Sequence, residues 1–99
     1  MTVTSVLPPI EVPQLSGGRE RARALVDGLR HRMRGATIVV DFRRMVAGTP
    51  SFADELVTRV LVDGGAAALR AEHVSREFAQ YLLEAARDHG VAEPVPEVH

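Results

Sequence analysis

The feature that most constrains the fold is the run ATIVVDF at residues 36–42, which is β-branched and almost wholly apolar. A short run of this kind is typical of a strand buried on both faces of a sheet. Segments with helical periodicity lie on both sides of it, and successive strand candidates are separated by about a dozen residues or more, the length that a parallel crossover needs. We therefore expect a small, mainly parallel β-sheet alternating with about three helices, in one domain spanning residues 1–99.

The segment before this strand, residues 16–35, has the periodicity of an amphipathic helix. Its apolar positions fall on one helical face: Ala22, Leu25, Val26, Leu29 and Met33. Arginines occupy the rest of the circumference, Ser16 or Gly18 is expected to act as an ordinary cap, and Gly35 is expected to end the helix.

Two further helices and a strand are predicted after the central strand. The second helix begins within TPSFADEL, at residues 49–56, and ends at the glycine pair 64–65. Residues 67–74 form a weaker strand candidate, because alanine has a low β propensity. The third helix is expected to start at Ser75, as its N-cap, and to end at Gly90.

Both ends of the chain are rich in proline. Residues 1–14 are expected to form a strand or an irregular lead-in, with Thr2–Leu7 as the strand candidate. Residues 91–99 are expected to form a flexible tail, too polar and too rich in proline to pack. With so few strands, one sheet face is expected to be partly open, or covered by the N-terminal segment or a second subunit.

Composition limits the class of protein. The absence of cysteine excludes disulfides and thiolate metal sites and favours a reducing compartment, so a cytoplasmic location is expected. No apolar run approaches the ~20 residues that span a bilayer, and no signal peptide is expected. All twelve basic residues are arginines, and eight of them lie between residues 19 and 44, whereas nine acids lie after residue 44. This asymmetry indicates either two solvated faces or a dipolar surface that steers a charged partner.

The polar residues form no catalytic constellation. Ser51 lacks a nucleophile-elbow setting and a nearby histidine, so it is expected to be a helix N-cap, with Asp54 completing a capping box. Asp54 and Glu55 are adjacent and point in different directions on a helix. The four histidines have no ligand spacing, and the arginine-rich helix has no aromatic residues for stacking on bases. We expect no enzymatic activity, cofactor, metal, nucleic acid or membrane partner.

The stretch IVVDFRRMVAGTPSFADELV, residues 38–57, resembles the STAS-like domain family, relatives of the STAS domains of bacterial anti-sigma factor antagonists. In that family a buried strand ends in an acid and an apolar residue, matched here by Asp41 and Phe42. A Ser-Ser-Phe-Ala-Asp-Glu-Leu type segment then opens a helix, matched by residues 51–56. Less specific similarity extends over approximately residues 15–87.

The resemblance implies a regulatory protein-binding module without catalysis. In antagonist STAS domains a serine kinase with a GHKL-type ATPase fold phosphorylates the hydroxyl at the start of this helix, and the unphosphorylated form captures that kinase and frees a sigma factor. The usual acceptor position corresponds here to Pro50, which leaves Ser51 and Thr49 as candidate phospho-acceptors. The alternative is a structural or oligomerising STAS-like subunit, such as a homodimer, without a phospho-switch.

The exposed side of the second helix and the loop at 43–51 are expected to form the partner surface. The candidate partner-binding residues are Thr49, Pro50, Ser51, Asp54, Glu55, Thr58 and Arg59. The buried side is expected to join a common core consisting of Leu29, Val39, Val40, Phe42, Phe52, Leu56, Val60 and Leu82.

Overall fold

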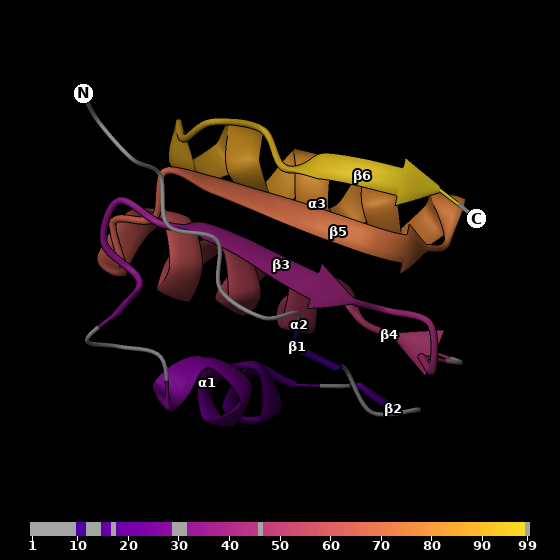
Figure 1. The fold of residues 1–99 in the computed structure, drawn as a ribbon. Helices are drawn as coiled ribbons and strands as arrows, with labels where there is room; N and C mark the ends of the chain where they lie inside the picture. The colour runs from indigo at the N-terminus through magenta and orange to yellow at the C-terminus, as the bar shows by residue number, and fades with distance from the viewer. Residues whose placement is uncertain (1–9, 12–14, 17, 29–31, 46, 99) are drawn as a thin grey trace.

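The computed structural model describes residues 10–11, 15–16, 18–28, 32–45 and 47–98, and it contains a four-stranded, all-parallel sheet (Figure 1). In spatial order its strands are β1 (Ile10–Glu11), β3 (Thr37–Asp41), β5 (Ala68–Val74) and β6 (Val95–Val98). A separate parallel pair joins β2 (Leu15–Ser16) to β4 (Ala47–Gly48). The expected small α/β fold with a parallel sheet is confirmed.

The helices are α1 (Arg19–Asp27), α2 (Pro50–Val57) and α3 (Arg76–His89), and α2 continues directly into a π-helix, η2 (Thr58–Asp63). Figure 1 shows α2 behind β3 and α3 behind β5 and β6, while no described helix lies over the other face of the sheet. The four strands follow one another in space as they do along the chain, so the order of the described strands never reverses. The crevice that binds ligands in many open α/β sheets forms where such a reversal occurs.

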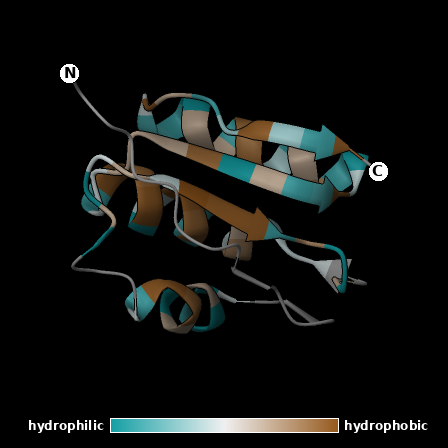
Figure 2. Ribbon diagram, in the orientation of Figure 1, coloured by the Kyte–Doolittle hydropathy of each residue, from teal (hydrophilic) through white to brown (hydrophobic). Residues whose placement is uncertain are grey.

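The central strand β3 is buried on both faces, as its sequence predicts. Ile38 and Val40 are inaccessible to solvent, and Val39, which alternates with them, is 4% exposed. In Figure 2 the strand is brown along most of its length. Ile38 and Val40 pack with the helices in one apolar core, whereas Val39 does not belong to that core. The expected core is thus confirmed except for Val39, and Leu29 lies outside the described residues.

The first helix is shorter than predicted. It ends at Asp27, with Gly28 rather than Gly35 at its C-terminus. Met33 is 1% exposed, but it reaches the core from the connection to β3, where Gly35 adopts a φ of 73°. An apolar residue at helical spacing can be buried from a loop as well as from a helix, so periodicity alone placed the end of this helix too late.

The C-terminal segment is not the loose tail that its composition predicts. Val95 and Pro96 pair in parallel with Arg70 and Ala71 of β5, which makes β6 an edge strand. Proline is tolerated at a sheet edge, where one side of the strand needs no ladder partner. Val95 and Val98 are about half exposed, whereas Pro94 is buried and Val91 packs against the core, so backbone pairing and apolar burial both hold this segment in place. The strand candidate Thr2–Leu7 lies outside the described residues.

The predicted boundaries of α3 are confirmed. The Ser75 hydroxyl accepts the backbone N–H of Phe78 at 3.1 Å, and Gly90 ends the helix in the left-handed conformation, at a φ of 67°. No helix in the described ranges is long and apolar enough to cross a bilayer.

Candidate functional site: a groove between α2 and α3

Thr49, rather than the predicted Ser51, is the N-cap of α2. The Thr49 Oγ1 accepts the backbone N–H of Phe52 at 3.2 Å. Pro50 occupies the first helical position, which suits proline because it has no N–H and a helical φ. The cap therefore falls two residues earlier than predicted, Ser51 lies exposed in the first turn, and no carboxylate occupies the capping-box position.

The same threonine oxygen also contacts the start of α1. The backbone N–H of Gly18 donates to Thr49 Oγ1 at 3.3 Å, and Gly18 precedes the first residue of α1 without a side-chain cap of its own. One hydroxyl thus accepts N–H groups from the beginnings of two helices, which reduces the number of unsatisfied donors at both.

The loop that carries Thr49 packs against an aromatic cluster. A Cβ at Gly48 would lie 2.8 Å from the ring of Phe78 and 2.9 Å from Met45 Sδ. The Phe78 ring in turn lies 5.2 Å from Phe42 and 6.1 Å from Phe52, measured between ring centroids. The missing side chain at Gly48 therefore allows the close approach that positions the start of α2.

Asp54 joins all three helices. Its Oδ2 accepts from Arg19 Nη1 of α1 at 2.5 Å, and its Oδ1 lies 2.8 Å from His89 Nε2 at the end of α3. The Thr58 hydroxyl donates to the Asp54 backbone carbonyl at 2.8 Å, so toward His89 Nε2, 3.1 Å away, it can only accept. Since both neighbouring oxygens accept, the Nε2 atom of His89 carries a hydrogen. The hydrogen bond from Arg19 is the main reason that the pKa of Asp54 lies below its usual value.

Glu55 is buried, contrary to its expected position on an exposed surface. It is 6% exposed and accepts from Arg59 Nε at 2.7 Å, with Arg19 Nη1 at 3.4 Å and Arg23 Nε at 3.5 Å. The Arg59 hydrogen bond is the main cause that lowers the pKa of Glu55. A carboxylate removed from water requires such partners, so Glu55 is committed to contacts within the chain.

A groove of about 300 Å³ lies at the start of α2. It is lined by Arg19, Pro50, Ser51, Asp54, Tyr81, Glu84, Ala85 and Asp88. Three predicted partner-binding residues, Pro50, Ser51 and Asp54, therefore come together here, whereas Thr49, Glu55, Thr58 and Arg59 do not line it.

The α3 side of this groove was missed by sequence reasoning. Tyr81, Glu84 and Asp88 follow the spacing of one helical stripe, which is the only sequence signal that they share a surface. The Tyr81 hydroxyl donates to Glu77 at 2.8 Å, and this hydrogen bond is the main reason that the pKa of Tyr81 is raised. Which neighbouring element the stripe faces depends on how α3 packs beside α2.

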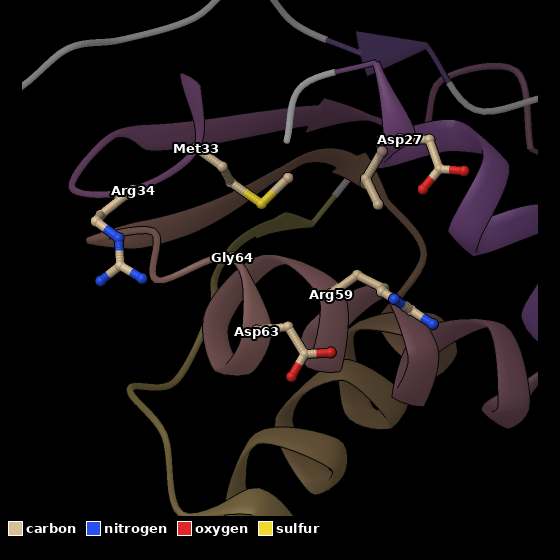
Figure 3. Close-up of a pocket in the computed structure, with 7 residues that line it drawn as sticks. Asp27, Met33, Arg34, Arg59, Asp63 and Gly64 are labelled. Carbon is tan, nitrogen blue, oxygen red and sulfur yellow. The ribbon is translucent and has the colours of Figure 1, made fainter. Parts of the chain in front are cut away.

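A second cavity, of about 410 Å³, lies between the end of α1 and η2 (Figure 3). It is lined by Val26, Asp27, Met33, Arg34, Arg59, Asp63 and Gly64. Arg59, predicted as a partner-binding residue, therefore belongs to this cavity rather than to the groove.

A third cluster lies at the carboxyl ends of β3 and β5. Asp41 Oδ1 accepts the backbone N–H of Arg43 at 2.9 Å and lies 3.1 Å from His73 Nδ1. Burial of the Asp41 carboxyl favours its neutral form, but the hydrogen bonds from Arg43 and His73 outweigh this effect and lower its pKa. His73 has a φ of 54° beside an irregularity in the β5–β6 pairing, so the Asp41 contact helps to fix a strand end.

The groove contains one hydroxyl and one engaged carboxylate at the start of α2. The Ser51 hydroxyl has no hydrogen-bond partner within the described ranges, and the nearby Asp54 carboxylate is engaged by Arg19 and His89. Among the described residues, no group of three or more histidine, cysteine, aspartate or glutamate side chains could hold a metal ion.

The fold defines this protein as a small α/β protein with a parallel sheet. Comparisons of the chain with protein-family models, with curated proteins and with solved structures find no match. The resemblance to STAS-like domains therefore rests on this sequence alone, and chiefly on residues 38–57.

Proposed function

We propose that this protein is a cytoplasmic, non-catalytic regulatory module of STAS-like type, which binds a protein partner through the groove at the start of α2. The observation that carries the proposal is the groove itself, which joins Pro50, Ser51 and Asp54 of the TPSFADEL segment to the exposed side of α3. A partner that recognises this segment would contact α3 at the same time.

The partner that the resemblance implies is a serine kinase with a GHKL-type ATPase fold, of the kind that controls a sigma factor. Ser51 is the favoured phospho-acceptor, because it is exposed and lines the groove. The Thr49 hydroxyl already accepts two backbone N–H groups, and its phosphorylation would disturb the starts of two helices. A phosphate on Ser51 adds about −1.5 to −2 charges beside Asp54, and this change of charge would release the partner.

Affinity capture from the native cell tests the proposal. The wild-type chain is expected to retain an ATPase of GHKL fold, identified by mass spectrometry. The Ser51→Asp variant is expected to lose this ATPase. The Ser51→Asn variant, whose side chain has the shape of aspartate without its charge, is expected to keep it. If Ser51→Asp and Ser51→Asn capture equal amounts of the ATPase, Ser51 is not the switch. If the wild-type chain retains no ATPase of GHKL fold, the proposed partner is refuted.

A specific observation favours the alternative, a structural or oligomerising subunit. The edge strand β6 exposes Val95 and Val98, at 53% and 49%, and an exposed strand edge can pair with a second chain. Light scattering after size exclusion would decide: a dimer that becomes a monomer on Val95→Lys would support the alternative, and a concentration-independent monomer would exclude it.

A further inference from the structure

The groove between α2 and α3 contains a cationic side chain that comes from α1. Of the eight described residues that line the groove, only Arg19 is positively charged. The other charged residues of the lining are the carboxylates Asp54, Glu84 and Asp88. The Arg19 side chain is 51% exposed, although it pairs with Asp54. Among the lining residues that the structure describes, Arg19 is thus the one that could stabilise a negatively charged group in the groove.

Arg19 has hydrogen-bond donors that its contacts with α2 do not use. Its contacts with Asp54 Oδ2, at 2.5 Å, and Glu55 Oε1, at 3.4 Å, are both made by Nη1. A guanidinium has five N–H donors in a planar fork. The donors on Nη2 and Nε have no partner among the residues that the structure describes. Arg19 can therefore bind a second anion without releasing Asp54.

Ser51 is placed to carry such an anion to Arg19. It lies three residues before Asp54 on α2, and side chains at this spacing lie on the same face of a helix. Both residues line the groove together with Arg19, and the Ser51 side chain is exposed. A phosphate on Ser51 would therefore lie beside the guanidinium that pairs with Asp54.

We propose that Arg19 binds the phosphate of phosphorylated Ser51, an inference that rests on the proposed function. The proposed kinase transfers the γ-phosphoryl group of ATP to Ser51 Oγ, with loss of the hydroxyl proton and release of ADP. The Nη2 and Nε atoms of Arg19 then donate to two phosphate oxygens, a geometry for which the planar guanidinium is suited. Because Glu84 and Asp88 on the α3 wall repel the phosphate, it binds on the α1 side of the groove.

This contact would change the surface that a partner meets. In the unmodified chain the Arg19 guanidinium is about half exposed at the groove. After phosphorylation it would be covered by a group that carries about −1.5 to −2 charges and is held between α1 and α2. Phosphorylation would thus remove an accessible cation and add an ordered anion at the same point, and both changes would act on the release of the partner.

Phosphoserine incorporated at position 51 during translation tests the proposal without the kinase. A pH titration followed by ³¹P NMR measures the second pKa of the phosphate, which is ordinarily about 6. Arg19→Gln is expected to raise this pKa by about half a pH unit or more, because a cation beside the phosphate favours its dianion. Arg19→Lys keeps the charge and should restore most of the difference. Arg21→Gln removes the same charge from another side of α1 and should raise the pKa much less.

A second measurement uses the chain without a change at Arg19. The side-chain Nε–H signal of Arg19, observed by ¹⁵N NMR, should shift on phosphorylation of Ser51 and should titrate together with the phosphate. This measurement remains decisive if Arg19→Gln fails to fold, since that variant also loses the ion pair with Asp54. The unfolding temperature of each phosphorylated variant shows whether it is folded.

Three results would overturn the proposal. They are an equal phosphate pKa in folded wild-type and Arg19→Gln chains, an increase for Arg21→Gln as large as that for Arg19→Gln, and an Arg19 Nε–H signal that does not respond to the phosphate. None of these measurements requires a partner. Failure to capture an ATPase would therefore refute the proposed partner without changing the phosphate titration, and failure of the titration would leave the capture result unchanged.

Discussion

Asp54 Oδ2 lies 2.5 Å from Arg19 Nη1, so the acidic residue at the centre of TPSFADEL is bound to the first residue of α1. Asp54 therefore holds α1 in place at the same time as it lines the groove. The proposed partner would therefore meet a carboxylate that Arg19 already engages.

The cap assignment predicts different effects for two neighbouring hydroxyls. Thr49→Ala should lower the free energy of unfolding by ~0.5–2 kcal/mol, because it removes the acceptor for the Phe52 N–H, and Thr49→Ser should retain most of the stability. Ser51→Ala should change it by less than about 0.5 kcal/mol, because the Ser51 side chain is exposed. Urea unfolding measures all three variants, and a larger loss for Ser51→Ala than for Thr49→Ala would show that the cap lies at Ser51.

The packing of α2 predicts a large effect at Leu56. This side chain is fully buried in the common core, so Leu56→Ala should destabilise the fold by ~2–5 kcal/mol through loss of apolar burial and formation of a cavity. Val62→Ala, at a position 43% exposed, serves as the matched control and should cost less than about 0.5 kcal/mol. An unfolding midpoint for Leu56→Ala equal to that of the wild type would contradict the facing of this helix.

Two glycines in close contacts predict intolerance of a methyl group. Gly64→Ala should destabilise most, because its Cβ would meet the Arg59 and Val60 carbonyl oxygens at 2.6 and 2.8 Å, and backbone cannot move aside easily. Gly48→Ala should destabilise less, because its Cβ would meet side-chain atoms of Phe78 and Met45 rather than backbone atoms. Gly28→Ala, with nothing within 4 Å and an ordinary φ, is the control and should be neutral or slightly stabilising. Thermal unfolding of the three variants should follow this order, and a neutral Gly64→Ala would contradict the close contact.

The paired carboxylates predict loss of stability in acid. The pKa values of Asp41, Asp54 and Glu55 are all lowered in the folded protein. A carboxylate whose pKa is lowered in the folded state stabilises the fold at pH values above its unfolded pKa, which is near 3.8 for Asp and 4.5 for Glu. This stabilisation is lost as the pH falls through the pKa of the folded state. The urea concentration at the unfolding midpoint should therefore decrease as the pH is lowered from about 5 to about 3.

Glu55→Gln identifies one source of this pH dependence. The variant should be less stable than the wild type at neutral pH and should lose less stability on acidification, because it has one paired carboxylate fewer to protonate. Glu93→Gln, at an exposed side chain, is the control and should leave the slope unchanged. Parallel pH profiles for Glu55→Gln and the wild type would show that the Glu55 ion pairs do not contribute.

The sequence by itself determined the elements whose signals are local. The β-branched run of β3, the cap and the terminal glycine of α3, and the apolar face that places Leu56 in the core are all confirmed. Each of these signals depends on the propensities of neighbouring residues or on spacing within one element, so no knowledge of the tertiary structure is required.

Only the tertiary structure decided which side chains meet across elements. Arginines of α1 bury Glu55 on a helix face that was expected to be exposed, α3 supplies one wall of the groove, and β5 orders a proline-rich segment as β6. In each case the deciding partner is distant along the chain. Ion pairing, groove formation and strand pairing depend on the positions of separate elements in space, which the spacing of residues within one segment does not encode.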